Sequence, residues 1–212
     1  IIAWRIGSAD SPMRIIGAHT DSPNLRILPN PDILQQGWSQ LAIEIYGGVL
    51  LNSWLDRDLG IAGRVIGNDG SATLFNVAAP LARVPQLAIH LDRETNDRGL
   101  VLDRHQHMSP VWGLGPHNFA EWLTEVSGIN SIAAFDAQLF DITPAAILGV
   151  DNSLLASARL DNQLSCWAAI SALTSMVDTD ATVIVVLNDH EEVGSESTTG
   201  AAGPLLVNVI NR

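Results

Sequence analysis

The chain has 212 residues, of which 23 are acidic and 11 are basic, and it carries a formal net charge of −12. This surplus of negative charge argues against nucleic acid and membrane surfaces as partners, because both are bound through clustered lysine and arginine side chains; no segment reaches the roughly 20 apolar residues of a membrane-spanning helix either. The hydrophobic fraction of 47% excludes a disordered chain, and the single cysteine excludes a disulfide scaffold and favours a reducing compartment.

Two short apolar runs, residues 1–4 and 13–18, predict strands near the start of the chain. The second run leads directly into His19-Thr20-Asp21, so ionisable side chains follow a strand. Position 1 is not methionine and lies inside an expected strand, while Arg212 closes a helical pattern. We therefore expect a piece of a longer polypeptide, truncated at both ends.

The stretch 29–149 predicts mostly β structure. Residues 41–46 alternate between apolar and other side chains, as in a half-buried strand. Asn68-Asp69-Gly70 separates two such runs and predicts a hairpin turn. Residues 86–91 alternate in the same way and predict a further strand.

Loop composition dominates residues 92–117, and a short helix is expected after them. Asn118 precedes Glu121 by three residues, which predicts a capping box at the start of this helix. Gly128 then marks its end.

After residue 150 the pattern changes to α/β. Residues 161–177 predict a helix that is apolar around most of its girth and therefore buried against a sheet. The β-branched run 183–187 predicts a central parallel strand covered on both faces, and a second helix is expected from about residue 199. The fold class is thus α/β, a mixed sheet with flanking helices.

This α/β domain is expected to be built from both ends of the chain, residues 1–28 and 150–212. The β-rich stretch 29–149 would then be an inserted domain. Open α/β sheets place their sites at the carboxyl ends of strands, which directs attention to the residues that follow 13–18 and 183–187.

His19 and Asp21 follow the first of these strands. In extended backbone, residues i and i+2 point the same way, so Asp21 can reach one ring nitrogen of His19 and make the other a better metal ligand. A strand-end histidine beside a solvated aspartate is the simpler alternative.

Glu191 and Glu192 follow the second strand. Two adjacent acids repel each other unless a cation compensates, and a metal-assisted hydrolase uses one carboxylate as ligand and another as base. An acidic loop without a role is the alternative, and the neighbouring His190 is a weaker ligand candidate. Asp161 opens a helix, where it could be a simple N-cap or could bridge two cations.

Three further residues with reactive side chains have simpler explanations. Cys166 lies inside an apolar helix with no base beside it, so a buried structural thiol is expected rather than a nucleophile. His105 and His107 are expected to be an exposed pair in a polar loop.

Three motifs occur in order along the chain: Gly17-Ala18-His19-Thr20-Asp21-Ser22-Pro23, Ser157-Ala158-Arg159-Leu160-Asp161-Asn162 and Asn188-Asp189-His190-Glu191-Glu192-Val193-Gly194-Ser195. Together they resemble the M18 metallopeptidase family, the aspartyl aminopeptidases. The resemblance covers almost the whole chain, including the segment 84–91 of the insertion.

This resemblance implies a site with two zinc ions. His19 would ligate one zinc, Asp161 would bridge both, and Glu192 would ligate the other. Asp21 and Glu191 would be the catalytic residues: Asp21 orients His19, and Glu191 is the general base for the attacking water.

The resemblance also implies that His90 of the inserted domain reaches into the site of a neighbouring subunit and helps to hold the substrate. It implies a homododecamer, a cytoplasmic setting, and peptide substrates that lose N-terminal, often acidic, residues. The family's remaining ligands, an aspartate and a late histidine, have no match because residues 197–212 contain neither type. We therefore expect the 212-residue chain alone to bind zinc weakly and to be inactive.

Two alternatives remain open at this stage. One keeps the two-metal site in a deacylase or carboxypeptidase, which combines a similar His-x-Asp and Glu-Glu arrangement with an inserted domain. The other is a non-catalytic assembly module that oligomerises through its β insertion.

Overall fold

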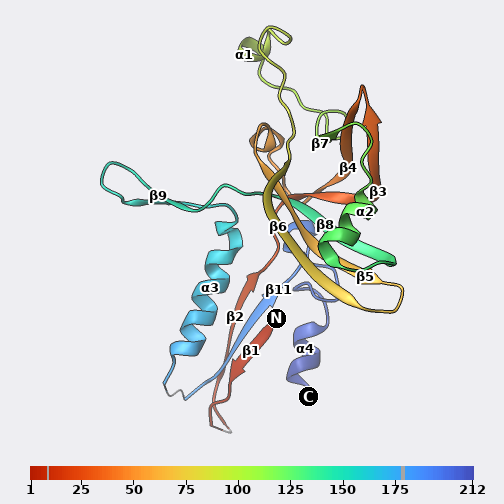
Figure 1. Ribbon diagram of the computed structural model, residues 1–212. Helices are drawn as coiled ribbons and strands as arrows, with labels where there is room; N and C mark the ends of the chain where they lie inside the picture. Colours follow the sequence, from red (N-terminus) through yellow and green to blue (C-terminus); the bar gives the residue numbers. More distant parts are fainter. Residues whose placement is uncertain (9, 178–179) are drawn as a thin grey trace. The chain divides into compact units, whose positions relative to one another are not determined.

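The structure is a computed structural model that describes residues 1–8, 10–177 and 180–212. It divides into two units, residues 1–23 together with 145–212, and residues 24–144 (Figure 1). These units divide the chain in the expected way, with their boundaries a few residues before the expected ones at 28 and 149. Strand β3 starts at Asn24 and belongs wholly to the inserted unit, while strand β9 starts at Ala146 and belongs to the other unit.

The first unit contains a three-stranded sheet in the order β1-β11-β2. Its strands are β1 (Ile2–Arg5), β2 (Met13–His19) and β11 (Thr182–Asn188). β11 pairs with β2 in parallel and with β1 in antiparallel orientation, and residues 183–187 are all buried. The run 183–187 is thus a central, buried strand, as expected, but it is parallel to only one of its two neighbours.

Helix α3 (Leu160–Ser175) packs on one face of this sheet. Cys166, Ala169 and Leu173 contribute its buried stripe, whereas Trp167 on its outer side is 68% exposed. The helix packs against the sheet, as expected, but it does so along one stripe, and part of its remaining apolar surface is exposed. Apolar side chains are exposed on α3 and on β2, whereas residues 183–187 are buried.

The remaining elements of the first unit are short. The strands β9 (Ala146–Leu148) and β10 (Leu154–Ala156) form a hairpin, the 3₁₀ turn η2 covers Glu191–Val193, and helix α4 covers Leu205–Ile210. The second expected helix therefore begins later than residue 199. Within the described residues, no helix has both the length and the apolar character needed to cross a membrane.

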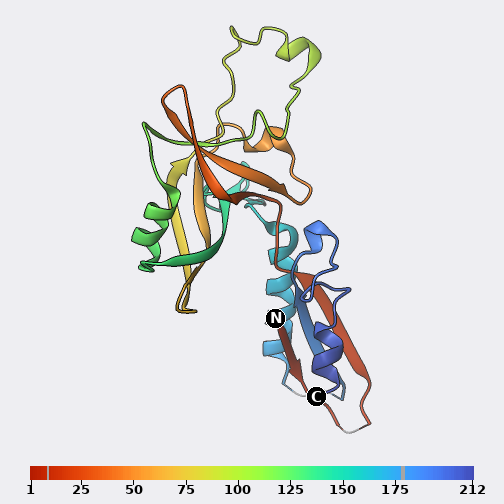
Figure 2. The same ribbon diagram turned by 90° about the vertical axis from the view of Figure 1, so that its right-hand side faces the viewer.

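The inserted unit is built on a six-stranded sheet in the order β6-β5-β8-β3-β4-β7, in which every neighbouring pair is antiparallel. The strands are β3 (Asn24–Gln35), β4 (Trp38–Tyr46), β5 (Leu59–Gly67), β6 (Ala72–Ala82), β7 (Val111–Leu114) and β8 (Ile132–Asp141). The 3₁₀ helix η1 (Leu51–Trp54) and the helices α1 (Thr95–Arg98) and α2 (Phe119–Ser127) complete the unit. Phe119 and Leu123 of α2 join the core of this sheet, beside which α2 lies in Figure 2.

The predicted hairpin turn of this unit is confirmed, whereas one of its predicted strands is wrong. The hairpin turn lies between β5 and β6, with Gly70 at a φ of +81°. The predicted strand over 86–91 is absent from the structure: these residues begin a long loop that carries α1 away from the sheet (Figures 1 and 2). Leu87 and Ile89 are exposed there, so their alternation has no neighbouring strand to pack on.

The predicted cap of α2 is present. The side chain of Asn118 accepts a hydrogen bond from the Glu121 N–H at 3.0 Å, and Gly128 ends the helix with a φ of +71°. Replacing Asn118 by Ala should lower the free energy of unfolding by about 1 kcal/mol, because it leaves that N–H without its acceptor. Urea unfolding followed by tryptophan fluorescence measures this change.

The matched control for Asn118→Ala is Thr124→Ala on the same helix. The Thr124 hydroxyl donates only to the Ala120 carbonyl of its own helix, so its loss should change the free energy by less than about 0.5 kcal/mol. Equal unfolding midpoints for wild type and Asn118→Ala would show that the cap contributes nothing.

Candidate metal centre

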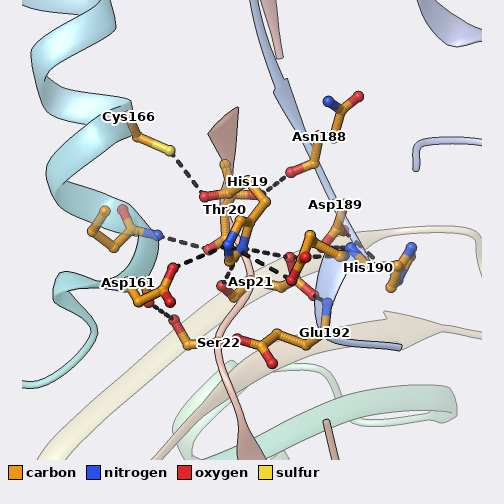
Figure 3. Close-up of polar contacts among 12 residues, drawn as sticks. His19, Thr20, Asp21, Ser22, Asp161, Cys166, Asn188, Asp189, His190 and Glu192 are labelled. Carbon is orange, nitrogen blue, oxygen red and sulfur yellow. Dashed lines mark hydrogen bonds and ion pairs between the residues drawn. The ribbon is translucent and has the colours of Figure 1, made fainter. Parts of the chain in front are cut away.

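The ends of β2 and β11 bring the two ionisable motifs together. His19 is paired with Asn188 in the parallel register. One residue further, the N–H and the hydroxyl of Thr20 both donate to the Asn188 carbonyl, at 2.9 and 3.0 Å. This bonding continues the ladder past the last pair and places the residues after His19 beside those after Asn188 (Figure 3).

Oxygen atoms of acidic residues lie on both sides of the His19 ring. Its Nδ1 lies 3.1 Å from the Asp21 carbonyl oxygen and 3.3 Å from the Asp21 carboxylate. Its Nε2 lies 3.2 Å from Asp161 Oδ1 and 3.7 Å from Glu191 Oε2. With Nδ1–H donating to Asp21, the Nε2 lone pair faces the other two carboxylates, which is the arrangement of a histidine that shares a cation with acids.

Burial and charge have opposite effects on the pKa of His19. Burial, the largest single cause, lowers it, while the hydrogen bond to the Asp21 carbonyl and the charges of Glu191, Asp21 and Asp161 raise it; the net result is a pKa above the ordinary value. The surrounding charges thus favour a positive group at this place. A metal ion would compete with the proton for the same nitrogen.

Asp21 also organises the turn that carries the two glutamates. Its carboxylate oxygens accept hydrogen bonds from the N–H groups of Glu191 and Glu192, both at 3.1 Å, and its side chain is only 7% exposed. One buried carboxylate therefore holds both the His19 ring and turn η2.

Potential ligand atoms of His19, Glu191 and Glu192 all lie within 4.8 Å of one another. A ring nitrogen with carboxylate oxygens is a donor set that zinc accepts, so these residues fit the metal that the sequence motifs imply. The sequence-based ligand set differed from this cluster, because it contained Asp161 and kept Glu191 aside as a base. In the structure Glu191 belongs to the cluster. Asp161, whose side chain is 86% exposed, is not one of its three members but contacts the His19 ring.

The candidates outside this cluster have other surroundings. His190 directs its Nδ1 to the Ser197 hydroxyl at 2.7 Å and is not part of the group of ligand atoms, so its candidacy as a ligand finds no support. His107 accepts the Asp103 N–H in an exposed loop of the inserted unit, and His105 is exposed there too, as expected. His90 is exposed on the long loop of that unit.

Sequence reasoning missed side chains that bind the backbone of the site. Gln163 donates from Nε2 to the Thr20 carbonyl at 2.7 Å, and Ser22 donates to the Asp161 carbonyl at 3.2 Å. Cys166 is buried, as expected, and its thiol donates to the His19 carbonyl at 3.0 Å. The only indication in the sequence was that Gln163 and Cys166 follow Asp161 closely in the same predicted helix.

Comparison with known proteins identifies the family. The family model described as aminopeptidase I zinc metalloprotease (M18) matches residues 1–212. The chain belongs to the M18 family. The recognition of this family from the three motifs is confirmed, and so is the mixed α/β fold class.

Individual relatives of this M18 chain agree. The probable M18 family aminopeptidase 2 of Streptomyces coelicolor is 47% identical over 225 residues, covering 100% of this chain and 52% of the relative. The structure of Chaetomium thermophilum mApe1 is similar with a TM-score of 0.88 at 30% identity, over 99% of this chain and 53% of that one. The S. cerevisiae mApe1 dodecamer is similar with a TM-score of 0.79 at 26% identity, over 99% and 51%. The chain thus spans about half the length of the relatives it matches.

Proposed function

We propose that this M18 chain supplies one half of a dinuclear zinc aminopeptidase that removes N-terminal residues, preferentially acidic ones, from peptides. The observation that carries this proposal is the convergence of one ring nitrogen, on His19, with carboxylates from Asp161, Glu191 and Glu192, which together come from three distant segments of the sequence. Because the chain spans about half of its relatives, the activity is proposed for the full-length polypeptide that contains it.

In that polypeptide, His19, Asp161 and Glu192 would hold the zinc ions. When bound, zinc lowers the pKa of a coordinated water toward about 7 and polarises the scissile carbonyl. Asp21 keeps Nδ1 of His19 occupied and leaves Nε2 free for the metal. Glu191, held by its N–H on Asp21, takes the proton of the attacking water and passes it to the leaving amine.

The 212-residue chain alone offers few ligands. His19, Asp161, Glu191 and Glu192 supply one donor group each, and if Glu191 serves as base only three remain for two ions. Zinc sites normally use three or four protein ligands per ion. We therefore propose that this chain alone binds zinc weakly and does not turn over peptides.

A substrate panel tests the proposed reaction. The full-length polypeptide should release the first residue from peptides with a free amino terminus, most rapidly aspartate or glutamate, and should leave N-acetylated versions of the same peptides intact. Removal of the acetyl group would instead indicate a deacylase, and release of the last residue a carboxypeptidase. A zinc-loaded, assembled protein that cleaves none of these peptides would support the non-catalytic module.

The inserted unit is proposed to complete the site of a neighbouring subunit in a cytoplasmic homo-oligomer, a dodecamer at full length. The solved dodecamer of mApe1 supports this proposal, since it matches 99% of this chain. His90 is the residue proposed to contact the substrate bound in the neighbouring subunit, and its exposed position on the long loop is compatible with that role.

Replacing His90 by Phe in the full-length polypeptide should lower kcat/KM about 100-fold, the loss typical of one group that stabilises the transition state. Zinc content should stay unchanged, because His90 lies in the other unit. Peptide kinetics and metal analysis measure both quantities. His105→Phe, at an exposed position of the same unit, is the matched control; equal rates for the two variants would remove His90 from the site.

A further inference from the structure

We infer that Gln163 and Cys166 are positioning residues that clamp the end of strand β2 to the start of helix α3 and thereby set the separation of His19 from Asp161. The Gln163 amide donates to the Thr20 carbonyl at 2.7 Å, and the Cys166 thiol donates to the His19 carbonyl at 3.0 Å. Figure 3 shows the thiol directed at that carbonyl. The two side chains stand three residues apart on one helix face and bind two consecutive carbonyl groups.

The position of β2 explains why helix side chains bind these carbonyls. Among the described residues, β11 alone pairs with β2. Backbone carbonyls at the end of a strand, where the pairing stops, need donors from outside the ladder. Helix α3, which packs against β2 and β11, supplies them.

Both clamp residues are suited to donate at neutral pH. Cys166 is 7% exposed, and its thiol lies within donating distance of the His19 carbonyl. The Gln163 amide donates without carrying a charge into a site that already holds several. The clamp therefore adds hydrogen bonds without changing the local electrostatic balance.

The geometry of Asp161 shows what the clamp restrains. Asp161 stands two residues before Gln163 on non-helical backbone, and its exposed side chain contacts Nε2 of His19 at 3.2 Å. Few side-chain contacts hold such a carboxylate, so its place relative to His19 follows from the backbone. The Ser22 hydroxyl, which donates to the Asp161 carbonyl, adds a third tie between the same two segments.

The metal-binding consequence rests on the proposed function, in which His19 and Asp161 hold zinc. The restraint on the backbone does not, because it can be measured without metal. The amide of Thr20 donates to the Asn188 carbonyl at the end of β2, so its exchange with solvent reports opening of the clamped segment.

Two variants remove the donors with little change of size: Gln163→Met and Cys166→Ala. In the metal-free full-length polypeptide, the double variant should exchange the Thr20 amide about tenfold faster than wild type, and its zinc affinity should fall about 10- to 100-fold, as for other groups that orient metal ligands. The single variant Cys166→Ser, in which Gln163 is unchanged, keeps a hydrogen-bond donor at position 166. It should therefore show the wild-type exchange rate and zinc affinity. Thr174→Ala is the control on α3, because that hydroxyl donates to carbonyls of its own helix.

Unchanged exchange and unchanged zinc affinity in the double variant would overturn the inference. Equal losses in Cys166→Ser and Cys166→Ala would overturn the part played by Cys166, since packing and not donation would then explain the effect. The double variant could show faster Thr20 exchange and weaker zinc binding while even the wild-type polypeptide cleaves no peptide. The positioning role would then be supported, and the proposed function would fail.

Discussion

Replacing Glu191 by Gln in the full-length polypeptide should lower kcat by about 10²- to 10⁴-fold, the range that general base catalysis contributes. The amide cannot accept the proton of the attacking water, although it has nearly the same shape as the carboxylate. The backbone N–H of residue 191 still donates to Asp21, so turn η2 should keep its conformation. Steady-state peptide hydrolysis measures the loss.

Metal content decides which role of Glu191 causes that loss. If Glu191 is the base, zinc content should match wild type; the crowded cluster of His19, Glu191 and Glu192 makes this measurement essential. Glu196→Gln is the matched control, because Glu196 is exposed in the same segment and lies outside the cluster. Persisting turnover together with a collapse of zinc content would show that the roles are misassigned.

The second large effect is expected for Asp21→Asn. An asparagine can place only one oxygen where Asp21 has two, so one of the N–H groups of Glu191 and Glu192 loses its acceptor, and the charge beside Nδ1 of His19 disappears. Zinc affinity should fall about 10- to 100-fold, with a similar loss of turnover. Competition with a chromophoric chelator measures the affinity.

Asp151→Asn provides the comparison, because Asp151 is an exposed aspartate of the same unit that caps only its own turn. It should bind zinc as wild type does. An Asp21→Asn variant with wild-type affinity would mean that the contacts of Asp21 to the ring and to turn η2 do not organise the metal centre.

Local patterns predicted the parts of the fold that depend on local chemistry. The run 183–187 predicted a buried strand because its residues are apolar without interruption, and Asn118 predicted a helix start because its cap bond is formed within three residues. Residues 86–91 show the limit. Their alternation fits a strand, but a strand also needs a neighbour to pair with, and the structure offers none there.

The candidate site was predictable to a similar depth. The spacing of His19 and Asp21 was enough to predict their contact, since residues i and i+2 share a side of extended backbone. The bonds from Asp21 to the N–H groups of Glu191 and Glu192 span about 170 residues of sequence. They depend on the parallel pairing of β2 with β11, which no local pattern specifies.

The most direct test is a crystal structure of the zinc-loaded full-length polypeptide, with anomalous diffraction recorded at the zinc edge. We expect two anomalous peaks joined by the Asp161 carboxylate, one about 2.0–2.1 Å from His19 Nε2 and the other about 2.0–2.2 Å from a Glu192 oxygen. Zinc bound elsewhere, or no peak within reach of His19, Asp161 and Glu192, would contradict the proposed metal centre.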